Sequence, residues 1–234
     1  MPYENDISLR MDLFNKKREE LLNNNYDNLS DFANGYRYFG IHKLENGWIY
    51  REWAPKAEKM YFTGDFNSWK IYEHEMKHLE NGVFEIYFDN LNALKIGDKI
   101  QTIVIHNGET LRRIPSYATR VVQDPVTHLW CAEIDNTLID EFPWTDQKFK
   151  PCKTPIIYEC HIGMSGEDYG IATYNYFTEN VLKRIKKNGY NTIQIMAVME
   201  HPYYASFGYQ VTNFFAASSK YGTSNDLKNL INTA

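Results

Sequence analysis

Residues 47–69 have the sequence GWIYREWAPKAEKMYFTGDFNSW, and this stretch decides the fold. Two short runs rich in aromatic and β-branched residues, 47–53 and 59–64, lie on either side of Pro55. Such residues favour β-strands, whereas proline lacks the backbone donor that a strand needs and so tends to end it. The stretch therefore predicts two strands separated by a turn, followed by a loop over residues 64–69.

The same pattern continues outward along the chain. Further short runs with strand composition are residues 36–43 (YRYFGIHK), 83–88 (VFEIYF) and 99–106 (KIQTIVIH). They are separated by Glu45-Asn46-Gly47, Asn81-Gly82 and Asn107-Gly108. Asn-Gly adopts the positive φ of a tight hairpin at little cost, and short strands at regular spacing favour an antiparallel sandwich. Residues 35–142 are therefore predicted to form an all-β, immunoglobulin-like sandwich.

A helix is predicted before the sandwich, in residues 7–24. Its apolar residues recur near helical spacing among charged residues, and Asp6 is a candidate cap. These apolar residues are Leu9, Leu13, Phe14, Leu21 and Leu22. The Asn-rich segment 23–34 should end the helix, so residues 1–34 are expected to form an N-terminal helical segment.

The pattern changes after the sandwich. Residues 143–155 (PWTDQKFKPCKTP) are polar and bounded by proline, which is typical of a linker. The following segments predict a strand at 155–163, a helix at 177–189 closed by Gly189, and a second strand at 191–199. Strand, helix and strand in this order favour a right-handed βαβ unit with parallel strands. A further helix is expected at 224–234, capped by Ser224 or Asn225.

Two apolar segments of this half, residues 191–198 (NTIQIMAV) and 212–217 (TNFFAA), are expected to remain partly uncovered. Parallel strands are normally buried on both faces, and a sheet of two strands leaves an open edge. Exposed apolar surface of this kind indicates a partner or aggregation surface.

The amino-acid composition limits which ligands and which cellular compartment are expected for the protein. The 234 residues carry a net charge of −5, which argues against a nucleic-acid partner. The first residues, MPYENDISLRMDLF, lack the apolar core of a signal peptide, and no apolar run reaches the ~18 residues of a membrane span. The three cysteines, Cys131, Cys152 and Cys160, are an odd number without metal-ligand spacing. A cytoplasmic protein without a membrane partner is expected.

Two tryptophans in the opening stretch are candidate ligand contacts. Trp69 ends a turn that places a large ring beside the short polar side chains of Asp65 and Asn67, a combination suited to a sugar. The alternative is that the aromatic residues fill the core. From the residues alone, core packing is favoured for Trp53 and Phe66, and both interpretations stay open for Trp69.

The motifs Arg51-Glu52-Trp53-Ala54-Pro55 and Gly64-Asp65-Phe66-Asn67-x-Trp69 resemble the starch-binding-type module of 1,4-α-glucan (glycogen) branching enzymes, which belong to the α-amylase superfamily. The resemblance extends from residue 35 to the end of the chain. It includes residues 113–115 (RIP), 120–125 (RVVQDP), 158–165 (YECHIGMS), 181–190 (VLKRIKKNGY) and 194–221. It implies a glucan-binding sandwich followed, over residues 156–234, by the first two β/α units of a truncated (β/α)8 TIM barrel.

The resemblance also implies the residues that contact an α-1,4-glucan such as glycogen or starch. In the N-terminal module they are Trp53, Ala54, Pro55, Trp69, Glu80, Asn81, Gly82 and Val83, with a further contact near Asn25. A family position that is usually lysine is occupied by Gln101, whose amide can still bond a hydroxyl group. In the later half, Tyr209 resembles the tyrosine that stacks under the sugar next to the scissile bond.

The resemblance implies no catalytic residue within residues 1–234. Retaining glycosyl transfer needs two carboxylates only ~5 Å apart. In the family these lie on barrel strands beyond residue 234. Glu159 and His161, and likewise Glu200 and His201, occupy strand ends but are expected to be structural. The family enzyme cuts an α-1,4 chain and transfers it to a 6-hydroxyl group without a cofactor.

No metal site is expected either. His74 and His78 are spaced by one helical turn, but they lie on a polar segment without a further ligand and should be solvated.

Three interpretations follow. The first is the N-terminal part of a branching enzyme, limited on its own to glucan binding. The second is a natural non-catalytic glucan-binding protein, which the uncovered apolar segments disfavour. The third is one half of a split enzyme, with the remaining barrel strands supplied as a partner by a second chain.

Overall fold

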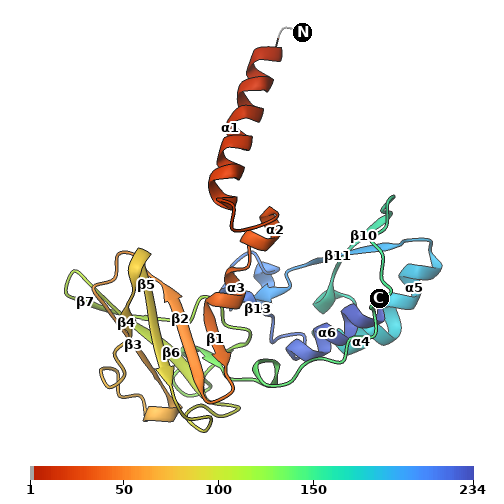
Figure 1. Cartoon of the computed structure of the whole chain (residues 1–234). Coiled ribbons are helices and arrows are strands. Elements are labelled where there is room, and N and C mark those ends of the chain that lie inside the picture. Colours follow the sequence, from red (N-terminus) through yellow and green to blue (C-terminus); the bar gives the residue numbers. More distant parts are fainter. Residues whose placement is uncertain (1–2) are drawn as a thin grey trace. The chain divides into compact units, whose positions relative to one another are not determined.

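The computed structural model describes residues 3–234, which divide into two compact units at residues 39 and 40 (Figure 1). The first unit is helical. It contains α1 (Glu4–Leu22), α2 (Leu29–Phe32) and α3 (Gly35–Tyr38). Asn23 adopts a left-handed conformation, with φ of 39°, and ends α1. The Asn-rich segment therefore stops the helix, as predicted.

Two predictions for the first unit are wrong in detail. The N-cap of α1 is Tyr3, so Asp6 lies in the first turn, where its charge favours the helix dipole instead of capping the backbone. Residues 36–38, predicted to begin a strand, belong to α3, in which the amide of Phe39 donates to the carbonyl of Gly35. The apolar side chains Leu9, Leu13 and Phe14 of α1 are exposed.

The second unit begins with two antiparallel sheets (Figure 1). The first sheet has the order β1-β2-β5-β4, with β1 at Gly40–Lys43, β2 at Trp48–Trp53, β5 at Val83–Phe88 and β4 at Lys77–His78. The second has the order β3-β6-β9-β8, and β7 also pairs with β6. Its strands are β3 at Lys59–Gly64, β6 at Lys99–His106, β7 at Glu109–Arg113, β8 at Val121–Gln123 and β9 at Trp130–Glu133.

The sheets enclose a single apolar core. Alternate residues of each strand point inward, because successive side chains of a strand lie on opposite faces. The largest buried side chains include Trp48, Tyr50, Phe62, Phe84 and Ile100. Phe66 packs against this cluster, as expected for a core residue. The predicted β-sandwich is confirmed.

The Asn-Gly turn signals also behave as expected. Asn107 and Gly108 have φ of 49° and 75° and join β6 to β7. Asn81 and Gly82 have φ of 58° and 75° and lie directly before β5. Both turns therefore use the positive φ that Asn and Gly adopt most easily.

The remainder of the second unit contains the predicted strand, helix and strand. The strands β10 (Ile157–His161) and β11 (Thr192–Met196) pair in parallel. Between them, α4 (Tyr174–Tyr176), the π-helical turn η5 (Phe177–Val181) and α5 (Leu182–Lys187) follow one another along the chain. Gly189, with φ of 92°, follows the last turn of α5.

The chain then forms a second small sheet and a last helix. The strands β12 (Met199–Glu200) and β13 (Asn213–Ala217) pair antiparallel, and α6 covers Ser224–Thr233. Thr223 caps α6 and forms a capping box with Asp226, so the cap lies one residue before the predicted Ser224. Short 3₁₀ turns lie at Asp65–Asn67, Glu80–Gly82, Asn136–Leu138, Ile162–Met164 and Tyr204–Ser206.

Hydrogen bonds and ring stacking join β13 to the sandwich. The side-chain amide of Asn213 donates through Nδ2 to the backbone carbonyls of Pro115 and Ser116 at 3.1 and 3.2 Å. The ring of Phe215 stacks on Tyr117 with centroids 4.2 Å apart. These contacts hold β13 against residues 115–117 of the sandwich.

The apolar segments of the later half are partly uncovered, as predicted. Phe214 and Phe215 of β13 are 70% and 52% exposed, and Ile193, Ile195 and Met196 of β11 are half-buried. Across residues 3–234, no helix is both long and apolar enough to cross a membrane. The three cysteines are free thiols.

Candidate functional site

Trp53 and the turn before β5 form the most exposed aromatic feature among the predicted sugar contacts of the sandwich. The Trp53 side chain is 60% exposed at the end of β2. Its indole nitrogen Nε1 donates to the Asn81 carbonyl at 3.0 Å. Next along the chain, the amide of Ala54 donates to the Gly82 carbonyl at 2.9 Å. The ring is therefore fixed at its nitrogen edge while its faces stay available for stacking.

Gly82 allows the turn to approach the strand end this closely. Its φ is +75°, and a Cβ atom placed there would lie 2.4 Å from Pro55 Cα. Only glycine fits both the conformation and the contact. The structure thus brings together two segments that lie apart in the sequence, residues 53–55 and 80–83. We call them the Trp53 cluster.

The members of the Trp53 cluster differ in what they offer a ligand. Pro55, Glu80 and Asn81 are exposed, and the Asn81 carbonyl contacts the indole nitrogen. They present an apolar ring, a carboxylate and an amide, which suits a neutral polyhydroxyl ligand. Val83 is 9% exposed and opposes Trp53 across the β2–β5 pair, so its side chain mainly supports the cluster.

The core packing favoured for Trp53 from its sequence is wrong. Trp48 and Tyr50 point into the core, so the alternation along β2 places Ile49, Arg51 and Trp53 on the outer face. The local pattern carries no signal for this, because each face of β2 has two apolar residues and one charged residue.

Trp69 lies in a separate loop, after β3 of the second sheet. It is half-buried, and its Nε1 donates to the Asp65 carboxylate at 2.8 Å. The other oxygen of Asp65 accepts from the Lys99 amide at 2.8 Å, so the loop is held to β6. Trp69 is therefore a firmly held ring with part of its surface available.

Gln101 is not available to a ligand at the surface. Its side chain is only 3% exposed on β6. The amide nitrogen donates to the Trp130 carbonyl at 2.9 Å, and the amide oxygen accepts from Arg112 at 2.9 Å. Both ends of the amide have internal partners, which explains why this position tolerates a neutral residue and argues against a sugar contact.

Asn25 and Tyr209 lie elsewhere in the chain. Asn25 belongs to the first unit, directly after α1, and is exposed. Tyr209 is 81% exposed and follows Gly208. Gly208 has φ of 80°, and a Cβ atom there would lie 2.3 Å from the Ala197 side chain. The Tyr209 ring is thus presented on a tightly packed turn with its surface open.

Glu200 organises the loop that carries Tyr209. It is fully buried, and one carboxylate oxygen accepts from the His201 amide at 3.1 Å while the other accepts from the Ser219 amide at 2.6 Å. The Glu200 carbonyl accepts from the Thr212 amide at 2.7 Å. These bonds join both ends of the loop, so the predicted structural role of Glu200 is confirmed.

Glu159 and His161 have separate hydrogen-bond partners. Exposed Glu159 accepts from the Gln194 side chain at 3.0 Å. Buried His161 instead bonds through Nε2 to the Tyr221 hydroxyl at 3.2 Å. His161 therefore belongs to the packing around Tyr221.

Stability should depend on the protonation of His161. Burial, and to a smaller extent neighbouring His201, lowers the pKa of His161. A histidine whose pKa is lower in the folded chain than its unfolded value of about 6.5 stabilises the fold above that pH. This contribution is lost as the pH falls through the folded-state pKa.

The measurement is the free energy of unfolding by urea at several pH values from 7 to 5. The wild-type chain should lose stability toward pH 5, and His161→Gln should show a smaller slope against pH. Equal slopes for the two proteins would exclude His161 as the titrating group.

His74 and His78 use their rings for packing. His78 is exposed but stacks on Phe84 with centroids 4.5 Å apart, and half-buried His74 packs against Phe66 and Phe88. The expectation that both are simply solvated is therefore incomplete. Among residues 3–234, no three His, Cys, Asp or Glu side chains are grouped closely enough to hold a metal ion.

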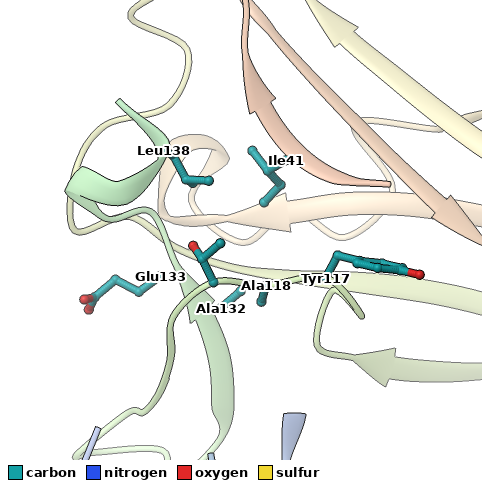
Figure 2. A pocket seen from close by; sticks show the side chains of 7 residues that line it. Ile41, Tyr117, Ala118, Ala132, Glu133 and Leu138 are labelled. Carbon is teal, nitrogen blue, oxygen red and sulfur yellow. The ribbon is translucent and has the colours of Figure 1, made fainter. Parts of the chain in front are cut away.

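Two hollows of the second unit are less suited to a glucan than the open Trp53 cluster. One cavity has a volume of about 10 Å³ and is lined by Ile41, Tyr117, Ala118, Thr119, Ala132, Glu133 and Leu138. Figure 2 shows the side chains around it. The cavity has room for at most one water molecule. A polar hollow of about 200 Å³ lies between residues 135–137 and the start of α6, and none of the described residues lining it is aromatic.

Comparison with known proteins agrees with this geometry. Residues 38–125 match carbohydrate-binding module 48 (isoamylase N-terminal domain). The whole chain aligns with the 1,4-alpha-glucan-branching enzyme of Rhizophagus irregularis at 41% sequence identity. The aligned part is 35% of the length of that enzyme. The chain is also 41% identical, again over its whole length, to 34% of the Felis catus enzyme of the same name. The chain thus spans about a third of the length of these relatives.

Solved structures give the same result for the fold. The pullulanase type I of Bacillus subtilis, solved in complex with maltose, superposes with a TM-score of 0.65 and 19% identity over 83% of this chain and 31% of its own. The whole chain is therefore similar to the N-terminal part of 1,4-alpha-glucan-branching enzymes, and its residues 38–125 match carbohydrate-binding module 48.

Proposed function

We propose that this chain is the N-terminal part of a 1,4-α-glucan-branching enzyme and that its sandwich binds α-1,4-glucan. The observation that carries the proposal is the exposed Trp53 ring, fixed by the Asn81 carbonyl beside the exposed residues Pro55 and Glu80. An open aromatic face with hydrogen-bonding groups at its edge suits a sugar ring, which has apolar C–H faces and polar hydroxyl edges.

Further contacts are proposed for the glucan. Trp69 offers a half-buried ring on its own loop, and Asn25 an exposed amide in the first unit. Tyr209 offers a largely exposed ring in the later half. Gln101 is left out because its amide is buried and internally bonded.

The later half is proposed to be the start of a (β/α)8 barrel. The parallel pairing of β10 with β11 across a helical connection supports this proposal, because such units build parallel barrels. The exposed side chains of Ile157 and Phe214 provide apolar surface that further barrel strands would cover. A cytoplasmic location is supported by three free thiols, since reduced cysteines are typical of that compartment.

In this proposal the complete enzyme cuts an α-1,4 chain and transfers it to a 6-hydroxyl group. The residues discussed above would contribute binding and positioning to that reaction. None of them supplies a pair of neighbouring carboxylates, since buried Glu200 is bonded to backbone amides and Glu159 to Gln194.

Native electrophoresis through gels with and without glycogen tests the proposed binding. The wild-type chain should be retarded by glycogen, and Trp53→Ala should weaken the apparent affinity about tenfold, because it removes a large stacking surface. Trp69→Ala should have a smaller effect, since its side chain is already partly buried. A folded wild-type chain that migrates equally in both gels would contradict the proposal.

A further inference from the structure

The outer face of the first sheet carries more than the Trp53 cluster. In the antiparallel register, Trp53 opposes Val83, Arg51 opposes Glu85 and Ile49 opposes Tyr87. Directly opposed residues share a face, so these three pairs form three successive rows on the two central strands, β2 and β5. The opposite face of the same strands, with Tyr50 and Phe84, lies in the core.

The first and third rows each carry an exposed aromatic ring. Trp53 is 60% exposed and Tyr87 is 50% exposed. Tyr87 lies four residues after Val83, so at the usual rise of a strand the two rows are about 14 Å apart. This separation exceeds the reach of a single sugar ring and corresponds to several consecutive glucosyl units.

The middle row is polar. The Arg51 guanidinium Nε donates to the Glu85 carboxylate at 2.7 Å, and the two side chains retain about a quarter of their exposure. A hydrogen-bonded ion pair holds both groups in place. The Glu85 carboxylate offers acceptor oxygens suited to sugar hydroxyl groups that pass between the two rings.

From this arrangement we infer that the glucan site extends along the β2–β5 strands, from Trp53 across the Arg51–Glu85 pair to Tyr87. The occupant is a single α-1,4-glucan chain long enough to reach both rings. The inference rests on the proposed glucan binding at the Trp53 cluster, with which this strip is continuous. It adds Tyr87 as a second stacking platform and predicts a preference for longer oligosaccharides.

Isothermal titration calorimetry of the full chain with maltotriose and maltoheptaose tests the inference. The wild-type chain should bind maltoheptaose more tightly. Tyr87→Thr keeps a good strand-forming residue and removes the ring, so it should weaken maltoheptaose about tenfold and change maltotriose by less than about twofold. Trp53→Ala should weaken both sugars, and Tyr87→Phe should behave as the wild type because the stacking ring remains.

A matched control is Tyr169→Ala, which removes another exposed tyrosine, outside the strip. It should leave both affinities unchanged. Unchanged maltoheptaose binding by Tyr87→Thr, with Trp53→Ala still impaired, would overturn the extended strip and leave the Trp53 cluster intact. Equal weakening of both sugars by Tyr87→Thr would also overturn it, because Tyr87 would then share one short site with Trp53. Absence of binding by the wild-type chain would overturn the proposed function itself.

Discussion

Gly82→Ala should abolish retardation by glycogen while the sandwich remains folded. Alanine at φ of +75° costs about 1–2 kcal/mol, because its Cβ crowds the backbone in the left-handed region. In addition, the new Cβ would lie 2.4 Å from Pro55 Cα, so the turn or the strand end must move. That movement separates the Asn81 carbonyl from the Trp53 indole and should weaken glycogen binding by more than about tenfold.

Gly108→Ala is the matched control for this prediction. Gly108 also follows an asparagine in a hairpin turn and has the same φ of +75°, but a Cβ atom there would have nothing within 4 Å. Both variants carry the same backbone strain, and only Gly82→Ala disturbs Pro55. If Gly108→Ala lost glycogen binding equally, general destabilisation and not the geometry of the Trp53 cluster would be the cause.

Glu200→Ala should lower the free energy of unfolding by about 3–5 kcal/mol. The carboxylate accepts from the backbone amides of His201 and Ser219 in a fully buried position. Alanine leaves both donors without an acceptor, and each unsatisfied buried group costs about 1–3 kcal/mol. Thermal unfolding followed by circular dichroism should show a fall of roughly 10 °C in the midpoint.

Glu159→Ala is the control for this prediction, because it also removes a carboxylate at a strand end but not the buried hydrogen bonds that Glu200 makes. Glu159 is exposed and accepts from the Gln194 side chain, so its removal should change stability by less than about 0.5 kcal/mol. Glu200→Gln should fall between wild type and Glu200→Ala, because the amide keeps one acceptor oxygen. Equal midpoints for Glu200→Ala and the wild-type chain would exclude Glu200 as the organiser of the Tyr209 loop.

Five sandwich strands, β1, β2, β3, β5 and β6, could be predicted from sequence because each has a local pattern, whereas β4, β7, β8 and β9 were not identified. Alternation and Asn-Gly turns identified the strands around residues 48–53, 83–88 and 99–106, and the change of period identified β10, α5 and β11. Residues 36–38 were predicted wrongly because aromatic composition favours a strand, whereas a local hydrogen bond from Phe39 to Gly35 closes a helical turn. The pairing order of the sheets depends on long-range contacts that no single segment specifies.

The site was predictable only in part. The motifs around Trp53 and Asn81 indicated their importance, but their convergence depends on Gly82 packing against Pro55, a contact between distant segments. Gln101 was expected at the ligand because of its sequence position. Its burial follows from partners on other strands, Trp130 and Arg112, that its neighbours in sequence do not reveal.

The way in which the Trp53 ring is held has a consequence for the engineering of ligand preference. The indole bonds to the main-chain carbonyl of residue 81, and the Asn81 side chain takes no part in that bond. Side chains that tolerate a positive φ, such as Asp or His, can therefore replace Asn81 without releasing the ring. Position 81 is thus a natural point for varying affinity in a library, because its chemistry can change while the aromatic platform stays fixed.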